Sequence, residues 1–498
     1  MVEQGYDFRR RWWTLGVLCL SLVIVVVGNT VLNVALPTLV RELDASSSDL
    51  QWIVDAYALV FAGLLLTAGA LGDRFGRKGA LTAGLVVFGG ASVAAAFADS
   101  AAGLIVLRAV MGIGAALIMP ATLSILTNVF PPGERGRAIA VWAGLAGAGA
   151  AIGPVASGFL LEHFWWGSVF LVNVPVIVLA LVGGRLLVPT SRDPGQPPLD
   201  PVGAVLSIAG LGSLLYGIIE APNHGWTDGL TLGWLGAGTA VLLAFAAWEL
   251  RRPEPMLDLR FFRNPQFSAA SAAITLVFFA LFGSFFLLTQ YLQLVLGYGT
   301  LEAGVRTLPM AFTMMVAAPA SARMVERFGP RRVVSTGLAV VAAGLLVLST
   351  ARVDSPYALI VVSLVVLATG MGMSMAPSTT GIMASLPLGK AGVGSAVNDT
   401  TRELGGALGI AVLGSLLASR YAGGLPDSVA ALPEPALAAV RNSLGAALKV
   451  AAGLPGPAGG DLAAAARQAF VDAMSVALSV GAVVVLVAAV LVRRYYPD

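Results

Sequence analysis

The stretch Gly69-Ala-Leu-Gly-Asp73-Arg74-Phe75-Gly76-Arg77-Lys78 lies between two long apolar runs and decides the fold. A similar stretch, Ala322-Arg-Met-Val-Glu326-Arg-Phe-Gly-Pro-Arg-Arg332, follows about 250 residues later. In both, glycine permits a tight turn, and the charged side chains need water at the ends of the apolar runs. A charged turn repeated at this interval indicates a chain built from two similar halves.

The chain has too few charged residues to cover a water-facing surface. Hydrophobic residues make up 57% of the sequence and charged residues 11%, and the mean hydropathy is +0.85. Soluble domains carry roughly a quarter charged residues, and about twenty apolar residues cross a hydrocarbon layer. Fourteen membrane-spanning helices are expected near 12–36, 49–71, 79–98, 102–126, 137–160, 167–188, 201–220, 230–250, 266–292, 303–323, 331–351, 356–379, 399–419 and 470–492.

Basic residues predict which ends of these helices face the cytoplasm. Arginine and lysine gather in alternate loops, and the other short loops hold only Arg41, Arg306 and Arg352. The basic loops face the cytoplasm by the positive-inside rule, which also places both chain termini there. Because these residues are spread over short loops, they do not indicate nucleic-acid binding.

The prediction is an all-α integral membrane fold with two six-helix bundles, residues 1–189 and 266–498, and two extra linking helices within 190–265. A long outer loop is expected at 420–469. Within it, Leu437, Val440, Leu444 and Leu448 fall at helical spacing. This spacing indicates either an amphipathic helix on the outer surface or a spacer with weak helicity.

The first charged stretch resembles the loop between the second and third helices of the major facilitator superfamily, secondary transporters built from two similar halves. The resemblance implies the major facilitator fold and a gate on the cytoplasmic side. It assigns this gate to Gly72, Asp73, Arg74, Gly76, Arg77 and Lys78. The alternative is that these charged residues only hold the loop on the cytoplasmic side, as the positive-inside rule predicts, and do not act as a gate.

Charged residues inside the spans are candidates for proton coupling. A charge inside a span costs at least ~2.5 kcal/mol and needs a partner or a wet cavity. Arg108, Asp55 and Asn29 are expected at a similar depth, roughly 9–11 Å from the outer helix ends. We expect Arg108 to pair with Asp55 until that acid takes up a proton. A purely structural ion pair is the alternative.

Two further segments point to export. Gly149, Gly153, Pro154 and Gly158 resemble the signature that antiporters of the superfamily carry in their fifth helix. The segments 29–37 and 51–57, with fourteen helices, resemble the QacA/EmrB-type branch of drug:proton antiporters. That branch often has aspartate where this chain has Asn29, which moves the proton-carrying role to Asp55 and weakens the expectation of strongly cationic substrates.

Asp399 and Glu403 are also candidates for proton coupling. Both are expected in the first turn of the thirteenth helix, where Thr400-x-x-Glu403 fits a capping box, so capping and gate contacts are the alternative. Aromatic side chains and flexible methionines suit a pocket for varied apolar molecules, although they often only pack. The proposed pocket residues are Phe278, Phe282, Phe286, Gln290, Met310 and Met314.

The sequence therefore predicts a proton-coupled exporter of lipophilic or cationic drugs, acting as a monomer in a bacterial inner membrane. Its partners would be a small-molecule substrate, the proton and the lipid bilayer. An exporter dedicated to one natural product or lipid is an alternative, and a non-transporting sensor is another. We find no catalytic residues, no metal ligands and no cofactor motif, and the single cysteine, Cys19, excludes an intramolecular disulfide.

Overall fold

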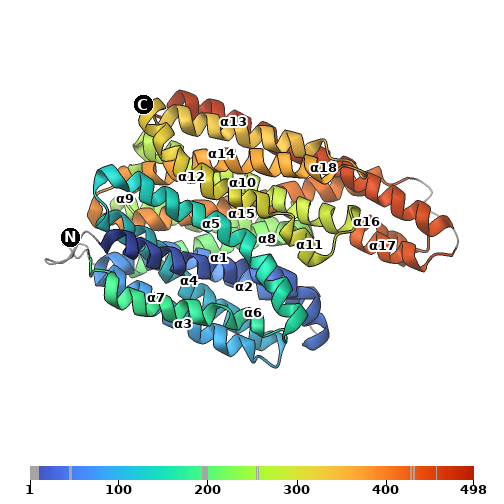
Figure 1. Ribbon diagram of the computed structural model, residues 1–498, viewed down its shortest axis with the longest axis horizontal. Coiled ribbons are helices and arrows are strands. Elements are labelled where there is room, and N and C mark those ends of the chain that lie inside the picture. Colours follow the sequence, from blue (N-terminus) through green and yellow to red (C-terminus); the bar gives the residue numbers. More distant parts are fainter. Residues whose placement is uncertain are drawn as a thin grey trace.

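The structure is a computed structural model that describes residues 10–43, 47–192, 200–253, 257–426, 432–455 and 457–497, together with residues 255 and 429. The described chain is helical and forms one elongated bundle, with both chain termini at one end (Figure 1). We call this the terminal end. The opposite end, where α16 and α17 lie, is the distal end (Figure 1).

The first bundle contains seven helical segments. They are α1 (Arg11–Glu42), α2 (Ser47–Phe75), α3 (Arg77–Ala96), α4 (Ala101–Val129), α5 (Pro132–His163), α6 (Ser168–Leu171) and α7 (Asn173–Leu187). The short α6 and the longer α7 together form the sixth span. Ser100 accepts a hydrogen bond from the Gly103 amide and so caps α4, and Pro132 starts α5, where its missing N–H costs nothing.

Two extra helices follow, α8 (Pro201–His224) and α9 (Gly229–Arg251). Asp200 caps the first of them and Asp228 caps the second. The helices pack closely along their length, because an added Cβ on Gly238 of α9 would lie 2.5 Å from the amide nitrogen of Leu214 on α8. They therefore form one hairpin, which we call the α8–α9 hairpin.

The second bundle contains the remaining helices. They are η2 (Leu259–Arg263), α10 (Pro265–Gln290), η3 (Tyr291–Val295), α11 (Thr300–Val305), α12 (Leu308–Phe328), α13 (Pro330–Ser349), α14 (Tyr357–Ala384), η4 (Leu388–Lys390), α15 (Ala391–Gly424), α16 (Glu434–Asn442), α17 (Leu444–Gly453) and α18 (Pro457–Tyr495). Helices α10 and α15 approach to backbone contact, because an added Cβ on Gly409 would lie 2.2 Å from the carbonyl oxygen of Phe279.

The helical fold confirms the predicted class. Thirteen segments of the described chain are long and apolar enough to cross a membrane. Helix α5, with 32 residues, takes the remaining position of the fourteen, packed between α1 and α12. The two bundles meet where α2 and α4 contact α15 and where α5 contacts α12 and α14.

Two predicted helix boundaries are wrong. Helix α15 begins at Ala391 rather than near residue 399, and α18 begins at Pro457 rather than near residue 470. The segment expected as an outer loop, 420–469, therefore contains the end of α15, the helices α16 and α17, and the start of α18. Leu437, Val440 and Leu444 are buried, because α16 and α17 pack on the protein.

Candidate functional site

Asp73, at the terminal end of α2, binds the first turn of α15. Both of its carboxylate oxygens accept hydrogen bonds from the Gly392 amide, at 2.9 and 2.8 Å, and Oδ2 also accepts one from the Val393 amide at 3.2 Å. The first amides of a helix have no partner within it, and the helix dipole favours an anion there. An acid from the first bundle thus caps a helix of the second.

Arg77 completes this contact from the start of α3. Its Nε donates to Asp73 Oδ1 at 2.8 Å, and its Nη2 donates to the carbonyl oxygens of Leu388 and Gly389 at 3.0 and 3.1 Å. Asp73 and Arg77 are 2% and 1% exposed, so both charges are removed from water. We call Asp73, Arg77 and the backbone of residues 388–393 the terminal-end contact.

Glycines allow the two helices to come this close. An added Cβ on Gly392 would lie 2.5 Å from the Gly69 carbonyl oxygen and 2.7 Å from the Asp73 carboxylate. Gly76 has φ +117°, a conformation that only glycine adopts readily, and it turns the chain between α2 and α3. A side chain at position 392 would therefore separate the two bundles at this point.

The other residues of the charged stretch lie around this contact. Gly72 is buried against Ala80. The Lys78 ammonium donates to the Arg185 carbonyl oxygen at 3.1 Å, and the Arg74 guanidinium lies 5.5 Å from the Phe75 ring.

Arg108 is fully buried in α4. Its Nη1 donates to the Gly28 carbonyl oxygen of α1 at 3.1 Å, and its Nε donates to the Ile53 carbonyl oxygen of α2 at 3.0 Å. The guanidinium lies 4.3 Å from the centre of the Tyr57 ring. Arg108 therefore joins three helices of the first bundle.

The predicted partners of Arg108 lie outside the described residues. The side chains of Asn29 and Asp55 are not described, so the predicted pair between Arg108 and Asp55 stays a prediction.

Asp399 and Glu403 lie inside α15, on the same face one turn apart; we call them the acid pair. The capping interpretation is wrong, because α15 begins at Ala391 and its N-cap is Lys390. Asp399 Oδ1 lies 3.4 Å from Arg402 Nη1 and accepts a hydrogen bond from Asn398 at 3.2 Å. Its Oδ2 is buried without a hydrogen-bond partner among the described residues and remains open to a proton or a bound donor.

Aromatic residues from two other helices surround Arg402. Its guanidinium lies 4.6 Å from the Phe278 ring of α10 and 5.5 Å from the Trp142 ring of α5. Trp142 belongs to the first bundle and is completely buried. The acid pair therefore lies where the two bundles meet.

The predicted antiporter segment lies in α5. An added Cβ on Gly149 would contact Val26 of α1 at 3.4 Å, and one on Gly158 would lie 2.9 Å from Leu301 of α11. Gly153 is buried, and the side chain of Pro154 lies outside the described residues. Gly149 and Gly158 lie on opposite sides of α5, and their contacts are with one helix of each bundle.

The predicted substrate residues do not all lie together. Phe278 stacks on Phe282 with ring centres 6.0 Å apart, and Phe282 and Phe286 pack against glycines of α15. Gln290 donates to the Phe286 carbonyl oxygen of its own helix. Met314 is buried on α12, and Met310 is partly buried there. Of these six residues, Phe278 contacts Arg402, the arginine beside the acid pair.

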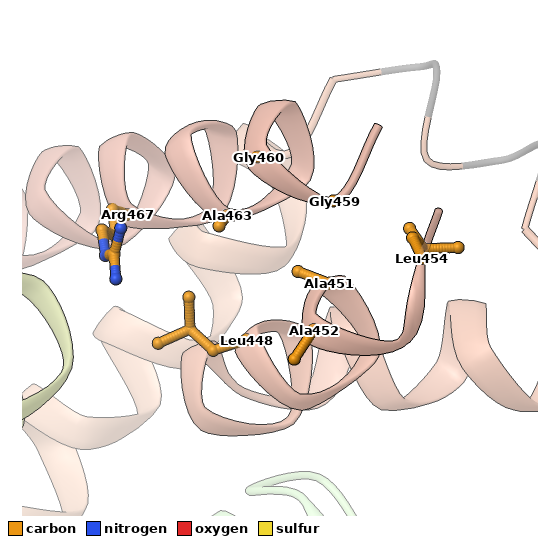
Figure 2. A pocket seen from close by; sticks show the side chains of 8 residues that line it. All are labelled: Leu448, Ala451, Ala452, Leu454, Gly459, Gly460, Ala463 and Arg467. Carbon is orange, nitrogen blue, oxygen red and sulfur yellow. The ribbon is translucent and has the colours of Figure 1, made fainter. Parts of the chain in front are cut away.

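A shallow apolar groove of about 370 Å³ lies at the distal end, between α17 and the first turns of α18 (Figure 2). Figure 2 shows Arg467 at one end and Leu454 at the other. The groove contains none of the predicted substrate residues. It is lined by Leu448, Ala451, Ala452, Leu454, Gly459, Gly460, Ala463 and Arg467.

Sequence reasoning missed Trp142, Thr379 and the main-chain amides of residues 392 and 393. Thr379 donates to the Asn398 side chain at 3.0 Å and so holds the segment that carries the acid pair. The one tryptophan in a glycine- and alanine-rich helix was a usable signal, because a large ring among small residues indicates a specific contact.

The chain is similar to known proteins over most of its length. Residues 18–410 match the sequence family described as Major Facilitator Superfamily. The multidrug efflux pump LfrA of Mycolicibacterium smegmatis is 40% identical over 488 residues, covering 97% of this chain and 96% of LfrA. The tetracenomycin C resistance and export protein of Streptomyces glaucescens is 36% identical over 499 residues, covering 98% and 93%.

Other comparisons extend over the whole chain. The methyl viologen resistance protein SmvA of Salmonella typhimurium is 37% identical over 490 residues, covering 97% of both chains. Among solved structures, the human organic anion transporter MFSD10 has a TM-score of 0.63 at 14% identity, covering 95% of this chain and 99% of MFSD10. At this identity the structural likeness shows the fold alone.

Proposed function

Since this chain belongs to the Major Facilitator Superfamily, we propose that it exports lipophilic or cationic drugs across a bacterial cell membrane in exchange for protons. Three relatives that align over nearly its full length are named for efflux, export or resistance. The relative named for tetracenomycin C export favours one second candidate, an exporter dedicated to a single natural product. In either case the protein acts as a monomer with both termini in the cytoplasm, in line with its basic loops.

The terminal-end contact is the cytoplasmic gate. While Asp73 caps α15, α2 and α15 are held together at this end, and a bound molecule has no route to the cytoplasm between them. The bundles, residues 1–189 and 266–498, pivot about the faces where α5 meets α12 and α2 meets α15. Separation at the terminal end admits substrate, and its restoration releases substrate at the distal end.

The acid pair carries the proton. The observation that supports this role is that both acids lie on α15, the helix that Asp73 caps at the terminal end. Asp399 lies seven residues from Gly392, roughly 10 Å along α15. A proton on Asp399 removes a charge that attracts Arg402, which keeps its contacts with the Phe278 and Trp142 rings. Because Trp142 belongs to the first bundle, the proton alters a contact between the bundles, and the loss of that proton restores the ion pair.

Substrate binds beside the acid pair, against the aromatic surface of Phe278. A cationic drug competes with the proton for the same carboxylates, which gives exchange. Gly149 and Gly158 contact one helix of each bundle. The segment that they share with Gly153 and Pro154 prevents proton leak in the absence of substrate.

Proton movement in vesicles tests the proposal. The purified protein is placed in acid-loaded liposomes with a pH-sensitive dye, and methyl viologen, ethidium or a neutral antibiotic is added outside. We expect compound-dependent proton release that is lost in Asp399→Asn and in Glu403→Gln. Asp461→Asn is the matched control, because Asp461 is an exposed acid in the first turns of α18. Release that survives both substitutions would contradict the role of the acid pair, and Asp55→Asn would then be tested.

A further inference from the structure

The α8–α9 hairpin contacts both bundles at the distal end. Its loop residue Trp226 donates from Nε1 to the Ser415 hydroxyl of α15 at 2.6 Å. Tyr216 of α8 lies with its ring centre 5.7 Å from that of Trp52 on α2. These two contacts reach α2 and α15, the helices that the terminal-end contact joins at the other end.

Side-chain contacts hold the two helices of the hairpin together at both ends. Asp200 accepts hydrogen bonds from Trp248 Nε1 at 3.1 and 2.9 Å at the terminal end, and Tyr216 packs on Trp234 at 4.9 Å near the distal end. Gly225 has φ +102°, and this turn directs Trp226 out of the hairpin toward α15.

The two attachments differ in extent. The contact with α2 includes the rings of Tyr216 and Trp52 and Ile208 against Gly63. Helix α8 also packs more extensively on α2 than on α15. The contact with α15 includes one short, directional hydrogen bond. The hairpin therefore moves with α2, and the Trp226–Ser415 bond is the contact that must break when α15 moves relative to α2.

Ser415 lies far from the terminal-end contact along α15. It is 24 residues beyond Ala391, roughly 36 Å along the helix. A rotation that separates α2 and α15 at the terminal end displaces their distal ends in the opposite sense. The hydrogen bond forms in the arrangement seen here, in which the terminal end is closed.

We propose that Trp226 and Ser415 are positioning residues of the transport cycle, whose hydrogen bond stabilises the state that is closed at the terminal end. The inference deepens the proposed alternating access, on which it rests. It gives the two extra helices a role, since they restrain the distal ends of α2 and α15. A hydrogen bond between neutral groups shifts such an equilibrium by roughly two- to tenfold.

Spin-label distances measure this equilibrium directly. In a Cys19→Ser background, one label pair replaces the exposed Gly133 and Arg332 at the terminal end, and another replaces Asp99 and Asp354 at the distal end. Distance distributions are recorded on the full chain in lipid nanodiscs without substrate. The closed fraction at the terminal end is the readout.

We expect Trp226→Phe and Ser415→Ala each to lower the closed-to-open ratio two- to tenfold, and the double variant to match either single one. Ser415→Thr keeps the hydroxyl and should restore the ratio. Ser479→Ala is the matched control, because that hydroxyl bonds only within its own helix. A ratio that Trp226→Phe leaves unchanged, or additive effects of the two substitutions, would overturn the inference.

Transport of the same variants separates this inference from the proposed function. If the variants shift the closed-to-open ratio at the terminal end but no compound causes proton release, the positioning role stands and the drug:proton exchange is contradicted. Proton exchange with an unshifted ratio would contradict the positioning role alone.

Discussion

Replacement of Asp73 by asparagine should open the terminal end. The carboxylate accepts from two amides of α15 and pairs with buried Arg77. Hydrogen bonds to a charged group contribute about 1.5–3 kcal/mol each, and breaking a buried ion pair costs about 3–5 kcal/mol. Asparagine keeps one acceptor oxygen, and Arg77 keeps its bonds to Leu388 and Gly389, so we expect a net loss of about 3 kcal/mol for the closed state.

At about 1.4 kcal/mol per factor of ten, this lowers the closed-to-open ratio roughly 100-fold. The assay is the distance between labels at positions 133 and 332, with thermal unfolding to verify that the variant is folded. Glu326→Gln is the control, because Glu326 is the exposed acid of the second charged stretch. A folded Asp73→Asn variant whose ratio changes less than twofold would refute the reasoning.

Three further predictions concern packing and charge. Gly409→Leu should destabilise the fold by about 3 kcal/mol or more, because the new Cβ would meet the backbone of α10. Gly212→Leu should be tolerated, because a Cβ at position 212 has open space around it. Thermal unfolding in detergent distinguishes the two variants. Hydrogen bonding from Arg11 lowers the pKa of Glu134, so the pair stabilises the fold above about pH 4.3. This contribution disappears as the pH falls through the lowered pKa. The melting temperature of Glu134→Gln should therefore differ from that of wild type at pH 6, and the difference should shrink as the solution is acidified. Arg108→Lys should reduce transport about tenfold, since one ammonium cannot reproduce both carbonyl bonds and the ring contact; wild-type transport would show that these bonds are dispensable.

The sequence predicted the helical class because apolar length and charge interruption are strong, local signals. The first charged stretch also pointed to Asp73 and Arg77 as gate candidates, through its resemblance to the major facilitator loop. The sequence could not predict what Asp73 binds. Its partners are the main-chain amides of residues 392 and 393, and main-chain amides are not distinguished by residue type. That contact joins residues about 320 positions apart, and only the fold brings them together.

The start of α15 was misplaced for a physical reason. Residues 398–403 are polar, and a polar run normally marks a helix end. Here Thr379, Trp142 and Phe278 from neighbouring helices contact this run, so that it lies inside the helix and is buried. A polar segment that lies buried inside a membrane helix, where the sequence pattern predicts a helix end, therefore indicates a functional site.

Helix α18 has 39 residues and is about 58 Å long, roughly twice the thickness of a hydrocarbon layer. Its first turns and the attached α16 and α17 extend beyond the other helices at the distal end (Figure 1). A protein of 50.9 kDa that is otherwise enclosed by detergent offers little to orient single particles in an electron micrograph. This three-helix feature continues into the bundle through α18, and it provides both an alignment marker and an epitope for an antibody fragment that leaves the terminal end uncovered.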